Sequence, residues 1–202
     1  VVPYELSARL ELCLARARRD IDANPLTGLP GNLTIMREAE RRIGNREAFA
    51  IAYLDVDNFK SFNDKYGFAR GDEVLRMAAR IIVNSVRSLE CEGTYVGHIG
   101  GDDFVFMLPT AQAAKACRRI IEDFDAIVPN FYDQEDRRKG YIESKDRRGN
   151  PQTFPLMTVS IAVVDTHTTD VVHLADLVAR AAEVKHYAKQ QSGSNYIIDR
   201  RK

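Results

Sequence analysis

The chain has 202 residues, of which 29 are Lys or Arg and 29 are Asp or Glu, so its formal net charge is zero. With 45% hydrophobic residues it has the composition of a soluble globular protein, and a chain of this length can build a full core without metal or disulfide staples. The absence of a basic surplus argues against a protein that grips long nucleic acid, such as a polymerase on its template.

The cysteines and the hydropathy pattern indicate the compartment. Cys13, Cys91 and Cys117 are far apart and odd in number, which favours a reducing environment over a disulfide framework. No stretch approaches the roughly 20 consecutive apolar residues of a membrane span, and no cationic start precedes an apolar run. We therefore expect a cytoplasmic protein without a membrane span. Because the chain begins with Val, we also expect a fragment that lacks a covalently linked N-terminal sensory or regulatory region.

Residues 1–23 form the first predicted unit, an N-terminal helix or linker. Apolar or small residues recur at helical spacing along one face: Leu6, Leu10, Cys13 and Ala17. The segment is either a signalling or dimerising stalk or a helix that packs on its own domain, and it is too short to decide between them. Asn24-Pro25 ends the helix, because the residue before a proline is pushed out of the helical conformation.

Residues 24–202 are predicted to form one further domain. Apolar patterning predicts, in chain order, a helix at 33–43, a strand at 48–54, a helix that starts near Gly71, strands at 94–99 and 104–108, a helix at 110–128, a strand at 154–164, a helix at 171–190 and an edge strand at 196–198. The charged segment at about 130–153 is predicted to be an inserted β-hairpin. The order β-α-β-β-α-β predicts an α+β fold of the ferredoxin-like or polymerase-palm-like type, a central antiparallel sheet flanked by helices on one face.

Two pairs of carboxylates fall at strand ends in this arrangement. Asp55 and Asp57 follow the first predicted strand, and Asp102 and Asp103 lie in the turn between the next two. A central sheet would bring all four to one edge, where like charges raise one another's pKa unless cations neutralise them. Hard oxygen ligands favour Mg²⁺ or Mn²⁺, and such a site suits phosphoryl or nucleotidyl transfer. The alternative is a solvated strand end and a plain turn.

The chain resembles the GGDEF family of diguanylate cyclases over about residues 24–198. The signature is Gly100-Gly101-Asp102-Asp103-Phe104, in which Asp103 stands where the family has Glu. Gly-Asp-Asp alone also occurs in polymerases, so the resemblance depends on further matches in the expected order: Pro25 to Pro30, Asp55 to Lys60, Asn63-Asp64, Gly67 and Gly71 to Glu73.

The resemblance implies catalytic and metal-binding roles at the strand ends. Asp55 and Asp102 match the metal-binding carboxylates of the family, the Val56 carbonyl matches a backbone metal ligand, and Asp103 is the second signature acid. The cofactor implied is Mg²⁺, or Mn²⁺ in its place.

The resemblance also implies substrate-binding roles. The backbone amides that lead to Phe59 and Lys60 match a turn that cradles the phosphates of GTP, as unpaired N–H groups of a strand-to-helix turn can do. Asn63 and Asp72 match the pair that reads the edge of guanine, whose N1–H and N2–H₂ require an acceptor. Lys189 matches a phosphate-contacting lysine, whereas on its own it would be assigned to a solvated helix end.

The implied function is that of a diguanylate cyclase working as a homodimer. Each subunit would hold one GTP, and each 3′-hydroxyl would attack the other's α-phosphate in a two-metal reaction that releases two pyrophosphates and forms cyclic di-GMP. The partners implied are GTP and a second copy of the chain, and not nucleic acid.

Three departures from the family's pattern bear on activity. Asp103 is one methylene shorter than Glu, and His98 and Ser194 stand where family members carry arginines. Two cations that would offset the triphosphate charge are therefore missing, and Arg70 and Lys185 are the candidates to replace them. These departures motivate an alternative function, a catalytically degenerate domain that binds GTP or cyclic di-GMP as a regulatory module.

Overall fold

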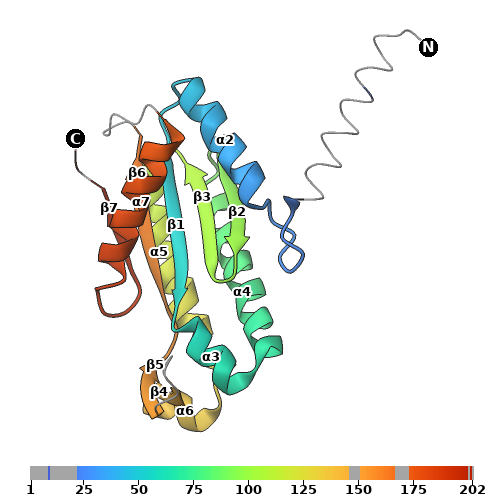
Figure 1. Cartoon of the computed structure of the whole chain (residues 1–202), viewed down its shortest axis with the longest axis vertical. Coiled ribbons are helices and arrows are strands. Elements are labelled where there is room, and N and C mark those ends of the chain that lie inside the picture. Colours follow the sequence, from blue (N-terminus) through green and yellow to red (C-terminus); the bar gives the residue numbers. More distant parts are fainter. Residues whose placement is uncertain (1–8, 10–21, 146–150, 167–172, 200, 202) are drawn as a thin grey trace.

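A five-stranded sheet forms the centre of the fold (Figure 1), with the strand order β2-β3-β1-β6-β7. The structure is a computed structural model that describes Arg9 and residues 22–145, 151–166, 173–199 and 201. The predicted N-terminal helix lies almost entirely outside these residues, so that helix and the domain division at residue 24 stay predictions.

The sheet is mixed rather than wholly antiparallel. Its strands are β1 (Ala50–Asp57), β2 (Tyr95–Gly100), β3 (Asp103–Leu108), β6 (Thr158–Asp165) and β7 (Asn195–Ile198). β1 pairs antiparallel with both β3 and β6, whereas β7 pairs parallel with β6. Parallel pairing requires a crossover connection, and a helix lies between these two strands in the sequence. The α+β palm-like fold is confirmed, with β7 as its parallel edge strand.

Helices cover both faces of the sheet, so the prediction of helices on one face was wrong. On one face lie α2 (Asn32–Gly44) and α7 (Leu174–Ala188), and on the other lie α4 (Phe68–Arg87) and α5 (Thr110–Ile127). The reason is the burial of β1, in which Ala52 and Leu54 pack with α4 and α5 while Ile51 packs with α2 and α7. A strand buried on both faces needs cover on both. Within the described residues, none of the helices has the length and hydropathy that a membrane crossing requires.

The chain between β1 and α4 contains a short helix that the sequence analysis did not predict. This helix, α3 (Phe59–Tyr66), follows β1 directly, and α4 begins at Phe68 rather than near Gly71. Gly67 separates the two helices with φ of 85°, a conformation that glycine adopts without steric cost.

The predicted strand at 154–164 is divided into two. Its first residues leave the central sheet and form part of a separate hairpin.

The inserted hairpin is present and is fastened to α3. It consists of β4 (Tyr141–Lys145) and β5 (Pro151–Pro155), preceded by the 3₁₀ turn η1 (Val128–Phe131) and the short helix α6 (Gln134–Lys139). Asp136 of α6 accepts a hydrogen bond from the Tyr66 hydroxyl and lies 2.6 Å from Lys65 Nζ. The Tyr132 hydroxyl accepts a hydrogen bond from the Met157 N–H at 2.8 Å. The contacts of Asp136 hold α6 against α3, and β4 lies beside the same helix (Figure 1).

Gly71 marks the close approach of α4 to α3 and gives a test of this packing. A Cβ at Gly71 would lie 1.8 Å from Asn63 Oδ1. Alanine in place of glycine normally stabilises a helix interior by up to about 1 kcal/mol. We predict instead that Gly71→Ala lowers the free energy of unfolding, measured by urea denaturation, by about 1–3 kcal/mol, because Asn63 or α4 must move.

The matched control is Gly44→Ala, since a Cβ at the end of α2 meets nothing within 4 Å. This variant is expected to unfold at the same or a slightly higher urea concentration than the parent chain. Equal stability of the two variants would contradict the close packing of α3 on α4.

Candidate active site

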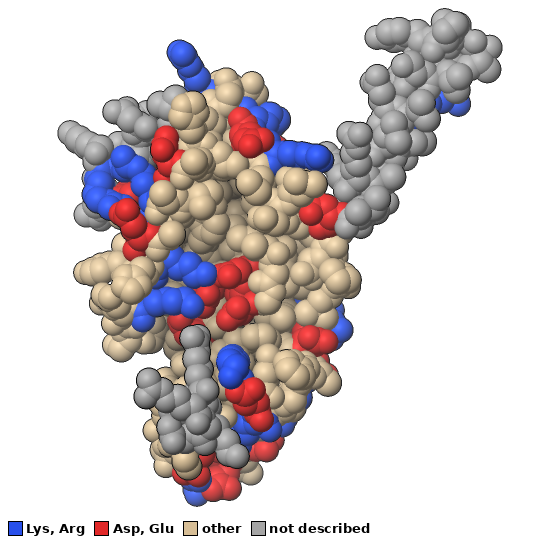
Figure 2. Space-filling model, viewed as in Figure 1, with Lys and Arg blue, Asp and Glu red and all other residues tan. Residues whose placement is uncertain are grey.

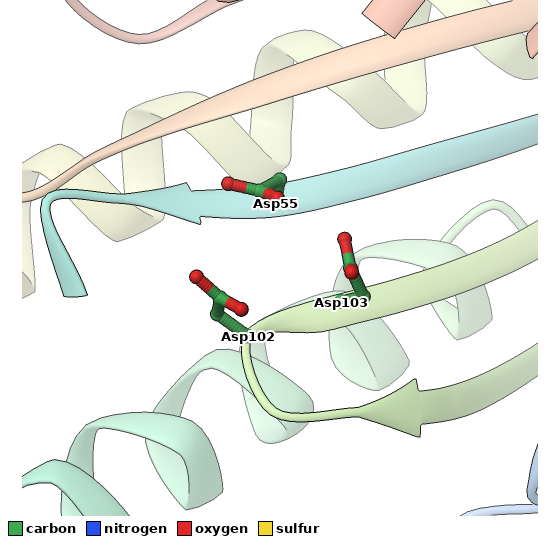
Figure 3. Close-up of side chains that lie close together, drawn as sticks. All are labelled: Asp55, Asp102 and Asp103. Carbon is green, nitrogen blue, oxygen red and sulfur yellow. The ribbon is translucent and has the colours of Figure 1, made fainter. Parts of the chain in front are cut away.

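Three carboxylates meet where β1 runs beside the turn between β2 and β3 (Figure 3). Asp55, Asp102 and Asp103 each offer an oxygen, and these oxygens lie within 4.8 Å of one another. Asp55 pairs with Asp103 across the β1–β3 ladder, and the Val56 N–H donates to the Asp102 carbonyl at 3.2 Å. Asp55 is 3% exposed, and the other two are partly buried. The sheet register therefore places the three acids together.

A buried histidine holds the turn that carries Asp102. His98 stacks on Phe104 with ring centroids 4.2 Å apart. Its Nε2 lies 2.9 Å from the Gly101 carbonyl oxygen, and its Nδ1 lies 3.1 Å from the Thr27 hydroxyl. Burial lowers the pKa of His98, which favours the neutral ring. His98 thus fixes the turn. It does not supply the cation that the resemblance led us to expect from an arginine at this position.

Asp57, the fourth carboxylate of the sequence prediction, stands apart from this cluster. Its Oδ2 accepts hydrogen bonds from Thr158 Oγ1 at 3.0 Å and from Ser160 Oγ at 2.8 Å. Asp57 lies at the expected sheet edge and lines the same cavity as Asp55 and Asp102, but it is not in the three-carboxylate cluster, because hydroxyls of the neighbouring strand β6 bind its carboxylate. Burial raises the pKa of Asp57.

Two lysines four residues apart lie against the cluster, Lys185 on α7 (Leu174–Ala188) and Lys189 at the C-cap of that helix. Lys185 Nζ lies 2.8 Å from Asp55 Oδ2 and also contacts Asp103. Lys189 Nζ lies 2.6 Å from Asp55 Oδ1. Burial acts to raise the pKa of Asp55, but the two ammonium groups outweigh it and the net pKa is lowered. Figure 2 shows acidic and basic side chains next to each other in the middle of this face.

The pKa values of Asp102 and Asp103 are raised, whereas that of Asp55 is lowered. Burial raises the pKa of Asp102, and the nearby charge of Asp55 adds to that rise. Burial likewise raises the pKa of Asp103, although its hydrogen bond with Lys185 acts in the opposite direction. The cluster therefore contains more negative charge than its surroundings neutralise, and a further cation would reduce the repulsion among the carboxylates.

A cavity of about 870 Å³ opens beside the cluster. Its volume is that of a small-molecule site, and its walls come from the end of β1, the start of α3, the hairpin and the loop after α7: Asp55 to Ser61, Asp64, Asp102, Gln152, Phe154, Pro155, Thr158, Lys189 and Gln191 to Gly193. Amide groups at a helix start favour an anion. The cavity thus combines a surface for anions with carboxylates for a cation.

The predicted substrate-binding residues fall into two groups. Phe59, Lys60 and Lys189 line the cavity. Asn63 on α3 and Asp72 on α4 are not among the described residues that line it. Asn63 Oδ1 is buried against Gly71, where the two helices meet, and has no hydrogen-bond partner among the described residues. Whether this pair reads a base stays a prediction.

The donor set at the cluster fits a divalent cation such as Mg²⁺ or Mn²⁺. Carboxylate oxygens are the ligands that these hard cations prefer. Asp55 Oδ1 is buried and makes no hydrogen bond, although Lys189 Nζ approaches it. Val56 borders the same cavity, in keeping with a backbone ligand. These residues can hold a metal ion without rearrangement of the sheet.

The positions of the two candidate replacement cations could not be predicted from the sequence. Lys185 lies in the cluster, whereas Arg70 Nη1 lies 3.1 Å from Asp133 Oδ1 and helps to fasten the hairpin unit. The Ser194 hydroxyl accepts a hydrogen bond from the backbone of β6 at 3.0 Å. The one signal in the sequence was the spacing of four between Lys185 and Lys189, which places both on one helix face.

Comparisons with known proteins agree on one family. The family described as "Diguanylate cyclase, GGDEF domain" matches residues 21–195. The chain is 27% identical over 197 residues to diguanylate cyclase VdcA of Vibrio cholerae, covering 95% of this chain and 50% of that protein. It is 32% identical over 109 residues to diguanylate cyclase DgcP of Pseudomonas aeruginosa, covering 52% of this chain and 16% of that protein. The chain thus spans half or less of the length of these two relatives.

Solved structures share the fold. Diguanylate cyclase SiaD of Pseudomonas aeruginosa, in complex with its activator SiaC, is similar with a TM-score of 0.67 and 25% identity, covering 97% of this chain and 68% of that one. The coiled coil and GGDEF domain of DgcB of Caulobacter crescentus, in complex with c-di-GMP, is similar in fold with a TM-score of 0.64 and 21% identity, covering 97% and 95%. Because the family match extends over most of the chain and includes the carboxylate cluster, the chain belongs to the GGDEF-domain family.

Proposed function

We propose that this chain is a diguanylate cyclase, which condenses two GTP molecules into cyclic di-GMP and two pyrophosphates. The observation that carries the proposal is the convergence of Asp55, Asp102 and Asp103 beside a cavity of about 870 Å³. Membership of the GGDEF-domain family supports it. The relatives VdcA and DgcP are both named as diguanylate cyclases.

The residues around the cavity suit a guanosine triphosphate. Backbone amides at the start of α3, near Phe59 and Lys60, would receive phosphate oxygens. Lys189 borders the cavity with its side chain 41% exposed, so its ammonium group can turn from Asp55 to a phosphate. Outside the cavity lining, on α3 and α4, the amide of Asn63 and the carboxylate of Asp72 would offer acceptors for the N–H groups of guanine.

The carboxylates would prepare the 3′-hydroxyl for attack. A divalent cation held at the cluster of Asp55, Asp102, Asp103 and the Val56 carbonyl would lower the pKa of that hydroxyl and stabilise charge on the α-phosphate. Lys185 and Lys189 offset the negative charge that accumulates. One chain holds one GTP, so formation of the ring requires a second copy whose nucleotide faces the first.

A second candidate function is favoured by the lysines that contact Asp55. Both oxygens of Asp55 lie within 2.8 Å of an ammonium group. His98 and Ser194, at the places of the family's arginines, make contacts within the fold instead of presenting cations. A domain of this kind could bind GTP or cyclic di-GMP as a regulatory module without turnover.

The purified chain incubated with GTP and Mg²⁺ distinguishes the two functions. The cyclase proposal predicts two pyrophosphates for each cyclic di-GMP, both followed by chromatography. Asp55→Asn is predicted to slow product formation by about 100-fold or more, because charge stabilisation at the reacting phosphate is lost. GTP binding by the parent chain without any product would instead support the regulatory module.

The control for this variant is Asp123→Asn. Asp123 is a surface carboxylate of α5 that lies 3.8 Å from Arg119. Its substitution should leave the rate of cyclic di-GMP formation at the parental value. An equal loss of cyclic di-GMP formation in Asp55→Asn and Asp123→Asn would contradict a catalytic role for Asp55.

The guanine assignment is tested by Asp72→Ala. Loss of its carboxylate leaves donors of the base unpaired, so we predict that GTP affinity measured by calorimetry falls about tenfold or more. The preference for GTP over ATP should fall by a similar factor, while Asp123→Ala retains both. Unchanged selectivity in Asp72→Ala would mean that other residues read the base.

A further inference from the structure

The carboxylate cluster has a cavity side and a rear side. Asp55, Asp102 and Lys189 line the cavity, whereas Asp103 and Lys185 are not among the described residues that line it. The two oxygens of Asp55 have different neighbours, since Oδ1 lies near Lys189 and Oδ2 lies near Lys185. We call the group of Asp55 Oδ2, Asp103 and Lys185 the rear position.

Lys185 bridges two carboxylates at the rear position. Its Nζ lies 2.8 Å from Asp55 Oδ2 and donates a hydrogen bond to Asp103 Oδ1. A cation shared by two carboxylates is the arrangement in which divalent ions are held at transfer sites. The Lys185 side chain is 25% exposed. Two carboxylates therefore hold this ammonium group, whereas Lys189 is ion-paired, among the described residues, with Asp55 alone.

The cavity side is arranged differently. Asp55 Oδ1 is buried, and its neighbouring cation is Lys189 Nζ at 2.6 Å. The Asp102 carboxylate lines the same cavity, with an oxygen within 4.8 Å of one of Asp55. Lys189 is more exposed than Lys185, at 41% against 25%. The cavity side therefore offers Asp55 Oδ1 and Asp102 to a divalent ion once Lys189 moves away.

The charges agree with this division. The three carboxylates bring three negative charges, and Lys185 and Lys189 together bring the charge of one divalent ion. One negative charge remains at the cluster. Once Lys189 moves away, Lys185 and a single divalent ion balance the three carboxylates, and the charge of Lys189 is free for an incoming triphosphate.

We propose that the Lys185 ammonium group permanently holds the rear position, so that the cluster takes up one divalent ion, on the cavity side, rather than two. The inference rests on the proposed function and specifies the cations of that site. It makes Lys185 a positioning residue for Asp55 and Asp103, and it gives the shortened signature acid Asp103 a partner within the chain.

The number of bound Mn²⁺ ions tests the proposal. Equilibrium dialysis against Mn²⁺ and 3′-deoxy-GTP, which lacks the attacking hydroxyl, counts the ions and nucleotides held per chain. The parent chain is expected to hold one Mn²⁺. Lys185→Met, which removes the charge and keeps an apolar stem, is expected to hold two, about a twofold rise. Lys185→Arg should hold one.

The matched control is Lys139→Met, because Lys139 Nζ lies 2.6 Å from Glu135 Oε1 on the exposed helix α6. It should hold one Mn²⁺, as the parent chain does. Thermal denaturation identifies folded variants, and Lys185→Gln gives the same comparison if Lys185→Met does not fold.

Two Mn²⁺ ions in the parent chain, or equal numbers in the parent chain and Lys185→Met, would overturn the proposal. A failure of the proposed function has a different signature. A chain that holds one Mn²⁺ and one nucleotide and yields no cyclic di-GMP from GTP contradicts the cyclase and leaves the role of Lys185 standing.

Discussion

Repulsion among three carboxylates at one end of a buried strand is the constraint on which this structure depends. Asp55 is almost fully buried and lies opposite Asp103 in the β1–β3 register, with Asp102 in the adjacent turn. Such a cluster destabilises the fold unless cations offset it. Helix α7 supplies them, because it packs beside β6 and β1 with Lys185 and Lys189 facing the acids. Pairing of β1 with β3 therefore brings the acids together, and packing of α7 brings the cations that offset them.

The insertion belongs to the same site. Gln152 and Phe154 of β5 form part of the cavity wall, and Asp136 of α6 is bound by Lys65 and Tyr66 of α3. Lysine and tyrosine contacts at Asp136 outweigh its burial and lower its pKa, so this attachment keeps its charge at neutral pH. The helix that presents the backbone amides thus connects the hairpin to the strand that carries Asp55.

Much of this arrangement could be predicted from the sequence, and the parts that could not depend on tertiary contacts. The apolar run of β1 and the paired acids at two strand ends indicated where Asp55, Asp102 and Asp103 would meet. The same apolar run is buried on both faces, and a continuous run does not reveal how many layers of helices cover it. Asp57 left the cluster because β6 presents two hydroxyls beside it. The role of Lys185 depends on where α7 crosses the sheet, which no local pattern specifies.

Anomalous diffraction from crystals grown with Mn²⁺ and 3′-deoxy-GTP tests the central claim most directly. The account predicts one manganese peak between the carboxylates of Asp55 and Asp102, with the nucleotide in the adjoining cavity and Lys185 still in contact with Asp103. A map in which manganese avoids these carboxylates, or in which it displaces Lys185 from Asp103, would contradict it.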